Sequence, residues 1–183
     1  MRGEPGVSIG SARVERALVP LTATFQLGGA EIVARSGKAK EVALLPRMVG
    51  NSPPMRELAS LVERCGPLSM PVMVLGESGS GKELVARAVH ALSPRRTCPF
   101  VALNAGTLAP AMATPTLFGH ERGAFTGATE CRRGAFRAAH GGTLFIDELG
   151  ALPSEAQASL LRVVEDGVVV AVGADSGVEV AVR

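Results

Sequence analysis

Seven consecutive small, polar and charged residues form a segment that could bind phosphate, and they are followed by an acidic residue, Glu83. Residues 72–75, which precede the segment, are apolar and have the length of a buried strand. Downstream, apolar residues at 84, 85, 88 and 89 have helical spacing. Strand, glycine loop, lysine and helix together predict a phosphate-binding P-loop. Its seven residues are Gly76, Glu77, Ser78, Gly79, Ser80, Gly81 and Lys82.

The residue types in this segment suit an anion. Glycines let successive backbone N–H groups turn towards one ligand without Cβ clashes, and the following helix adds its free N–H groups. Lys82 contributes a full positive charge. Glu83 stands where most P-loops carry a magnesium-binding Ser or Thr. The alternative interpretation is a glycine-rich connector, which the flanking strand and helix disfavour.

An acidic pair, Asp147 and Glu148, follows a second apolar segment, residues 143–146. One carboxylate can hold magnesium, and the other can accept a proton from an attacking water. Alone, such a pair is usually a solvated turn. Downstream of a P-loop, at the carboxyl end of a strand, it indicates a site for nucleotide hydrolysis.

A glycine-rich hexapeptide is the third feature with a chemical interpretation. Two glycines flank one aromatic residue, which predicts a mobile loop with a single apolar knob. The alternative is a core aromatic in a tight turn. The six residues are Gly123, Ala124, Phe125, Thr126, Gly127 and Ala128.

The surrounding pattern predicts an α/β fold, a parallel P-loop sheet flanked by helices and preceded by a short β-rich segment. Residues 1–35 are expected to be β-rich, with a hairpin around Gly28 and Gly29. Residues 36–48 are expected to form a linker, and residues 49–183 the main domain. In that domain we expect a helix from Pro53 to Cys65 capped by Ser52, with Met55, Leu58, Leu61, Val62 and Cys65 on its inner face. We also expect a strand over 100–103 ending at Asn104, a glycine- and proline-rich crossing, a helix over 153–165 with Ala156, Leu160, Leu161 and Val164 inward, and strands over 168–172 and 178–182.

Composition excludes several classes of protein. The 183 residues are 46% hydrophobic and 20% charged, which suits a globular core. No apolar run reaches membrane-spanning length and the N-terminus lacks a signal-peptide core, so we expect a cytoplasmic protein without membrane contact. The net charge of +2 and the absence of Trp and Tyr argue against a nucleic-acid surface. The three cysteines lack metal-site spacing and fit reduced thiols.

From about residue 49 onward, the chain resembles the AAA+ ATPase module of sigma-54-dependent transcriptional activators (bacterial enhancer-binding proteins). The matching strings are GESGSGKELVARAVHALSPR, FGHERGAFTGA and GGTLFIDELGALP. The resemblance implies ATP and magnesium as cofactors and sigma-54 RNA polymerase holoenzyme as partner. It also implies self-association into a ring, and DNA binding only through a domain absent from this chain.

The resemblance also implies residue roles. The Walker A loop would run from Gly76 to Glu83, Asp147 would hold magnesium, and Glu148 would activate water. Asn104 would restrain that glutamate, residues 50–52 would line the adenine pocket, and the hexapeptide would touch sigma-54. Two positions depart from the family: Ala105 replaces a cysteine, and Val168, Val169 and Val170 replace a charged stretch.

Two alternatives stay open. The family's second sensor, arginine fingers, helical lid and helix-turn-helix are expected beyond Arg183, so this chain could be a nucleotide- or sigma-54-binding fragment that does not hydrolyse ATP. Residues 1–35 resemble the last strands of a forkhead-associated domain, which would make a phosphopeptide-binding interaction protein the other alternative. The same residues could instead form a β extension with no such function. The upstream residues that read phosphothreonine in such domains are not in this sequence.

Overall fold

The computed structural model describes four short strands between residues 7 and 33, residues 48 and 50, and all of residues 52–183. The chain divides into two compact units, residues 1–42 and 43–183. The predicted linker, residues 36–48, lies almost wholly outside the described residues. The predicted boundaries at 35 and 48 remain predictions.

The first unit contains an antiparallel sheet of order β2-β1-β3-β4. The hairpin predicted around Gly28 and Gly29 is confirmed, because β3 and β4 pair with Phe25 opposite Ile32. The resemblance to a forkhead-associated domain remains a prediction. The four strands are β1 (Val7–Ile9), β2 (Ala12–Val14), β3 (Thr24–Leu27) and β4 (Ala30–Val33).

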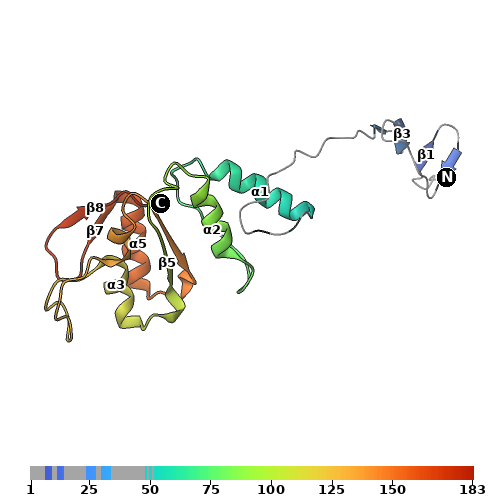
Figure 1. Cartoon of the computed structure of the whole chain (residues 1–183). Helices are drawn as coiled ribbons and strands as arrows, with labels where there is room; N and C mark the ends of the chain where they lie inside the picture. Colours follow the sequence, from blue (N-terminus) through green and yellow to red (C-terminus); the bar gives the residue numbers. More distant parts are fainter. Residues whose placement is uncertain are drawn as a thin grey trace. The chain divides into compact units, whose positions relative to one another are not determined.

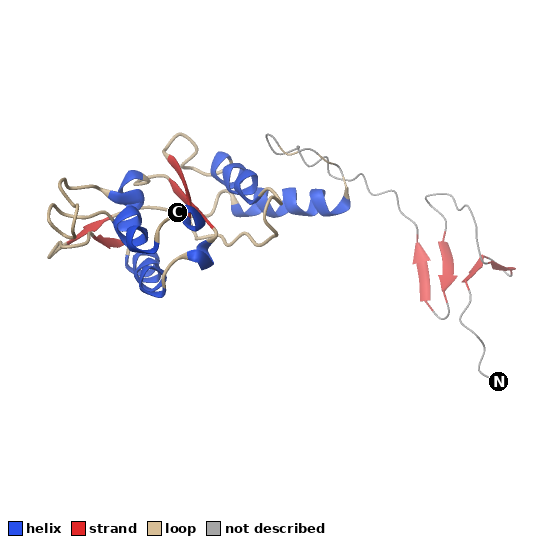
Figure 2. Ribbon diagram, turned by 90° about the horizontal axis from the view of Figure 1, so that it is seen from below, coloured by secondary structure: helices blue, strands red, loops and turns tan. Residues whose placement is uncertain are grey.

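The second unit is built around a parallel pair of strands, β5 (Phe100–Asn104) and β6 (Thr143–Asp147). Helix α2 (Lys82–Ala91) packs against β6, and α1 (Pro53–Cys65) packs against α2. Figure 1 shows these two helices on one side of the strand pair and the helices α3 (Pro110–Phe118) and α5 (Ser154–Asp166) on the other. The view from below in Figure 2 also has helices on both sides of the strands. The remaining elements are η1 (Ala105–Thr107), α4 (Gly134–Ala138), η2 (Leu149–Ala151) and a hairpin of β7 (Val168–Val170) and β8 (Gly177–Glu179).

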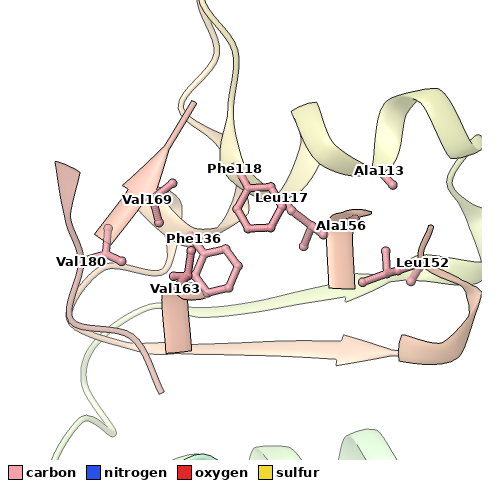
Figure 3. Close-up of a cluster of buried hydrophobic side chains, with 10 residues drawn as sticks. Ala113, Leu117, Phe118, Phe136, Leu152, Ala156, Val163, Val169 and Val180 are labelled. Carbon is pink, nitrogen blue, oxygen red and sulfur yellow. The ribbon is translucent and has the colours of Figure 1, made fainter. Parts of the chain in front are cut away.

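The main core lies between α3, α4, α5 and β7 (Figure 3). Leu117 is fully buried, and the rings of Phe118 and Phe136 stack with centroids 5.6 Å apart. Burying side chains of this size stabilises the fold by roughly 1.5–3 kcal/mol each. The other buried members of this cluster are Ala105, Ala113, Leu152, Ala156, Val163, Val169 and Val180.

Most predicted elements are present, with corrections to which faces are buried. Helix α1 begins at Pro53 after Ser52, although the Ser52 side chain makes no capping hydrogen bond. Ala59 and Val62 are its buried residues, whereas Leu61 is 42% exposed. In α5 the buried residues are Ala156 and Val163, so the prediction of an inward Leu161 and Val164 is wrong, because each of these is about half exposed.

The predicted strand over residues 72–75 is wrong. This segment forms no strand, and Met73 and Leu75 are 74% and 85% exposed. A strand exists only where a neighbouring backbone supplies hydrogen bonds, and within residues 52–183 the segment has no such partner. The apolar run therefore forms no strand, and most of its side chains are exposed beside the glycine loop.

The region between β5 and the glycine-rich loop contains a helix that the sequence did not predict. Helix α3 holds two prolines, and Pro110 sits near its first position, where the missing N–H costs nothing. Pro115 lies inside the helix, yet it is buried, so packing outweighs the local penalty.

Among the described helices, none is long and apolar enough to cross a membrane.

Candidate functional site

The predicted phosphate-binding loop leads directly into α2. Gly81 has φ 90° and Gly79 has φ 77°, left-handed backbone that favours glycine. Ser80 closes the turn, because its hydroxyl donates to the Glu77 carbonyl at 2.7 Å. Since α2 begins at Lys82, the first N–H groups of the helix follow the loop directly and have no acceptors within the helix. This is the local geometry that binds an anion.

The ammonium group of Lys82 lies across the mouth of this loop. Lys82 Nζ donates to the carbonyls of Gly76 at 3.2 Å and Glu77 at 2.9 Å. It also lies 4.0 Å from Asp147 Oδ1 at the end of β6. The structure therefore brings together two of the predicted site residues that are far apart in the sequence.

The other predicted polar residues meet at the carboxyl ends of β5 and β6. Asn104 and Asp147 are register partners in the parallel pair. Asp147 Oδ1 accepts a hydrogen bond from the Glu148 backbone N–H at 3.0 Å. Glu148 itself adopts the left-handed region with φ 53°, the one described residue other than glycine to do so. Such backbone costs energy in a residue with a side chain.

The side chains of Glu148 and Asn104 converge on Gly106. Asn104 Oδ1 accepts a hydrogen bond from the Gly106 N–H at 2.8 Å. The Glu148 carboxylate lies where a Cβ on Gly106 would be, so only glycine leaves room for it. Asn104 and Glu148 do not bond each other directly in the described part of the chain. The predicted restraint of Glu148 by Asn104 stays a prediction, although the two side chains share one neighbour.

A cavity of about 550 Å³ lies beside the loop. It is lined by Gly79, Gly81, Lys82, Glu83, Leu84, Arg87 and Asp147. Of the other predicted loop residues, Gly76 and Glu77 contact Lys82 through their carbonyls, and Ser78 is exposed. Gly50 and Ser52 of the predicted adenine segment are described and Asn51 is not, so that assignment also remains a prediction.

Sequence reasoning missed Arg87 in this cavity. Its guanidinium pairs with Glu83, with the Nη2–Oε1 distance at 2.6 Å and the Nε–Oε1 distance at 2.8 Å. The same group lies 4.5 Å above the Phe100 ring. The i,i+4 spacing of Glu83 and Arg87 was the available signal. The pair neutralises the acidic residue that replaces the usual hydroxyl.

The donor set of the cavity fits magnesium bound together with a phosphate. Magnesium in nucleotide sites usually takes one or two carboxylates and completes its shell with phosphate oxygens and water. Asp147 supplies one carboxylate at the cavity wall. Residues 52–183 contain no group of three side chains that could hold a metal ion by themselves, so the phosphate would have to contribute ligands.

The glycine-rich hexapeptide forms the tip of a loop between α3 and α4. The loop closes where His120 and Arg132 exchange backbone hydrogen bonds of 2.9 Å in both directions. Gly119 and Gly134 approach each other so closely that a Cβ on either would overlap the other backbone segment. Gly123 N–H donates to Ala128 O at 2.8 Å and so closes the hexapeptide.

The tip exposes polar and small residues and shields its aromatic one. Gly123 and Gly127 have φ 81° and 99°, with open space around both. Thr126 is exposed and Ala128 is buried, and Ala124 lies against Gly173. Phe125 is half-buried, with its ring edge-on to His120. It is therefore outside the core cluster of the unit.

Comparison with known proteins identifies the family. Residues 48–183 match the model of the sigma-54 interaction domain. Over 149 residues the chain is 45% identical to the response regulator protein PilR of Pseudomonas aeruginosa, which covers 81% of this chain and 34% of PilR. It is 41% identical over 172 residues to the DNA-binding transcriptional regulator NtrC of Proteus hauseri, which covers 94% of this chain and 35% of NtrC. The chain thus spans about a third of the length of these relatives.

Solved structures agree with this assignment. The crystal structure of NtrX from Brucella abortus in complex with ATP is 42% identical and superposes with a TM-score of 0.68, over 74% of this chain and 29% of NtrX. The complex of the same protein with ADP has the same TM-score and identity over 75% of this chain and 29% of NtrX. The predicted α/β fold class is confirmed by these likenesses and by the parallel β5–β6 pair between helices. The chain belongs to the sigma-54 interaction domain family.

Proposed function

We propose that this chain is the ATP-binding module of a sigma-54-dependent transcriptional regulator, and that ATP hydrolysis drives the loop of residues 123–128 against sigma-54 RNA polymerase. The approach of Lys82 Nζ to within 4.0 Å of Asp147 Oδ1 at the mouth of the glycine loop carries the proposal. It supports a site in which a triphosphate and its magnesium ion lie between an ammonium group and a carboxylate.

The charges of the cavity support a nucleotide rather than a neutral ligand. Lys82 and Arg87 contribute two positive charges, and Glu83 and Asp147 contribute two negative ones. An added magnesium ion would offset Asp147, while Arg87 already pairs with Glu83. The ammonium group of Lys82 is then free to attract phosphate. The attraction between two unit charges is about 4 kcal/mol at a separation of roughly 4 Å and an effective dielectric constant near 20. The crystal structures of NtrX in complex with ATP and with ADP support the same ligand class.

Glu148 is our candidate for the general base, and Asn104 for the residue that restrains it. In a hydrolytic cycle, Glu148 would accept the proton of a water that attacks the terminal phosphorus. A magnesium ion held by Asp147 would supply positive charge at the phosphate. The convergence of both side chains on Gly106 supports a common role. Asn104 would set the position of the carboxylate through this shared neighbour.

The glycine-rich loop is our candidate for the surface that contacts sigma-54. Its two glycines in open space allow the tip to move, and Thr126 is exposed at that tip. The membership of the chain in the sigma-54 interaction domain family supports this partner. By the same resemblance we propose self-association into a ring, with DNA contacted through another domain of the regulator.

Isothermal titration of the purified 183-residue chain with magnesium-ATP tests the proposal. We expect saturable binding that ADP displaces and that adenosine without phosphates does not, because the site is built for the phosphate chain. Absence of binding by ATP and ADP would overturn the proposal. Binding of adenosine as tight as that of ATP would move the site away from the glycine loop.

A further inference from the structure

His120 lies at the base of the glycine-rich loop, with its backbone fixed on both sides. The N–H and the carbonyl of His120 both form backbone hydrogen bonds of 2.9 Å with Arg132. On the other side, Glu121 N–H donates to Val172 O and Val172 N–H donates to Gly119 O, also at 2.9 Å. The backbone around His120 is thus hydrogen-bonded to two other segments of the protein, one at Arg132 and one at Val172. Only 6% of His120 is exposed, so its ring is buried at the base of the loop.

Phe125 rests on this buried ring. The centroids of the His120 and Phe125 rings are 5.0 Å apart at an interplanar angle of 62°, the edge-on arrangement that aromatic pairs prefer. Phe125 is half-buried in this position. A pair of this kind favours the docked position by about 2- to 10-fold over an undocked one.

A second feature of His120 opposes docking. Its Nδ1 atom is buried and has no hydrogen-bond partner anywhere in the described residues. A buried polar atom without a partner destabilises the state that buries it. For this nitrogen to oppose docking, water must reach it when Phe125 leaves the ring. The docked position of Phe125 on His120 therefore combines a favourable ring contact with an unfavourable buried nitrogen. Two opposing effects of similar size leave the docked position easy to reverse.

We propose that His120 is a positioning residue for the sigma-54 contact: it seats Phe125 in a docked position and releases it for an apolar surface of the partner. The inference rests on the proposed function, because it takes the loop of residues 123–128 as the contact. The glycines at 123 and 127 supply the hinges, since both have left-handed φ values and open space around them.

Fluorescence can report directly whether the side chain at position 125 is docked, because the sequence contains no Trp and no Tyr. In a Phe125→Trp background, the single indole reports by acrylamide quenching whether the side chain at 125 is docked. We expect His120→Ala to raise the quenching constant by about 2- to 3-fold and to shift the emission to longer wavelength. We expect His120→Phe to lower the quenching constant, because it keeps a ring and removes the unpaired nitrogen.

Opposite effects of the two variants separate seating from a general structural role. If His120 only stabilises the base of the loop, both substitutions should shift the quenching in the same direction, and this result would overturn the inference. Equal quenching in all variants would overturn it as well. Arg132→Ala is the matched control, since it alters the exposed side chain of the paired residue and should leave the indole signal unchanged. If His120→Ala does not fold, His120→Leu takes its place, with the same increase expected.

A sigma-54 binding measurement with Phe125 intact separates this inference from the proposed function. We expect His120→Phe to weaken binding to sigma-54 by about 2- to 10-fold and His120→Ala to strengthen it, because the docked form competes with the partner for Phe125. If the indole responds as expected and sigma-54 does not bind the chain, the seating of Phe125 stands and the proposed function fails. If sigma-54 binds but the indole does not respond, the proposed function stands and the role of His120 is refuted.

Discussion

Lys82 is the first residue of α2 and Asp147 is the last residue of β6, and their charged groups lie 4.0 Å apart. Neither element could form this pair alone. The side chain of Lys82 folds back over the glycine loop and donates to the carbonyls of Gly76 and Glu77. The parallel pairing with β5 fixes where β6 ends. The pair joins the two halves of the proposed nucleotide site.

Glu148→Gln should separate nucleotide binding from hydrolysis. Glu148 does not line the cavity beside the glycine loop, so magnesium-ATP affinity should stay within about twofold of wild type. Any steady-state phosphate release by the chain should fall by at least about 100-fold, because general-base catalysis is removed. Glu165→Gln, on the exposed face of α5, is the control and should preserve both values. Unchanged phosphate release in Glu148→Gln would remove Glu148 from the proposed mechanism.

Thr126→Ala should weaken the binding of sigma-54 and leave the binding of nucleotide unchanged. Thr126 is exposed at the loop tip and does not line the cavity, so ATP affinity should be unchanged. Binding of sigma-54 should weaken by about 10-fold or more, as expected when a central interface residue is truncated. Thr129→Ala supplies a matched control, because Thr129 is an exposed threonine in the same loop but outside the hexapeptide. Equal losses in the two threonine variants would argue against a specific role for the hexapeptide.

Leu117→Ala should strongly destabilise the second unit. Leu117 is fully buried in the core between α3, α4 and α5, and its truncation should lower the free energy of unfolding by about 2–5 kcal/mol. Leu161→Ala is the comparison, since Leu161 is 56% exposed and its loss should cost less than about 0.5 kcal/mol. Urea unfolding followed by circular dichroism measures both. Equal destabilisation by the two variants would contradict the described packing of α3 and α5.

The stability of the chain should fall in mild acid because of His90. Burial lowers the pKa of His90, and the positive charges of Arg183 and Arg87 lower it further. The buried ring hydrogen-bonds Thr143 Oγ1 at 2.9 Å and lies against Phe100. Below the ordinary pKa of 6.5, the unfolded chain binds a proton that the folded chain resists. The contribution to stability is therefore complete above that pH and is lost as the pH falls towards the lowered pKa.

Urea midpoints at about pH 7.5 and about pH 5.5 test this dependence. The midpoint should be lower at the acid pH in the wild-type chain, and the difference should shrink in His90→Gln, which cannot take up a proton. His140→Gln is a control on an exposed histidine and should keep the wild-type difference because His90 is intact. A His90→Gln variant with an undiminished pH dependence would show that other groups cause it.

The parts of the site that could be predicted from sequence are those whose geometry is local or fixed by strand order. The glycine loop needs only its own residues and the start of α2 to take its shape. Asn104 and Asp147 were predicted at strand ends, and the parallel register makes them neighbours. By contrast, Arg87 was missed because its entry into the cavity depends on the stacking of its guanidinium on Phe100, which comes from another element.

The errors in the fold also have physical causes. Residues 72–75 have the composition of a strand, but composition cannot supply the neighbouring backbone that a strand requires. Helix α3 was missed because Pro115 lowers the propensity of a helix interior, whereas burial of Leu117 and Phe118 outweighs that penalty. In α5, apolar residues occur on more than one face, so the period alone could not say that Val163 rather than Val164 faces the core.

Titration of magnesium-ATP into the Lys82→Ala variant is the most direct test of the proposed site. Removal of the ammonium group should weaken affinity by at least about 10-fold, because it removes the one positive charge that faces both the loop and Asp147 among the residues lining the cavity. Arg162→Ala, an exposed arginine on α5, should bind magnesium-ATP as the wild-type chain does. Wild-type affinity in Lys82→Ala, with the fold intact by circular dichroism, would contradict the proposal that this loop binds the nucleotide.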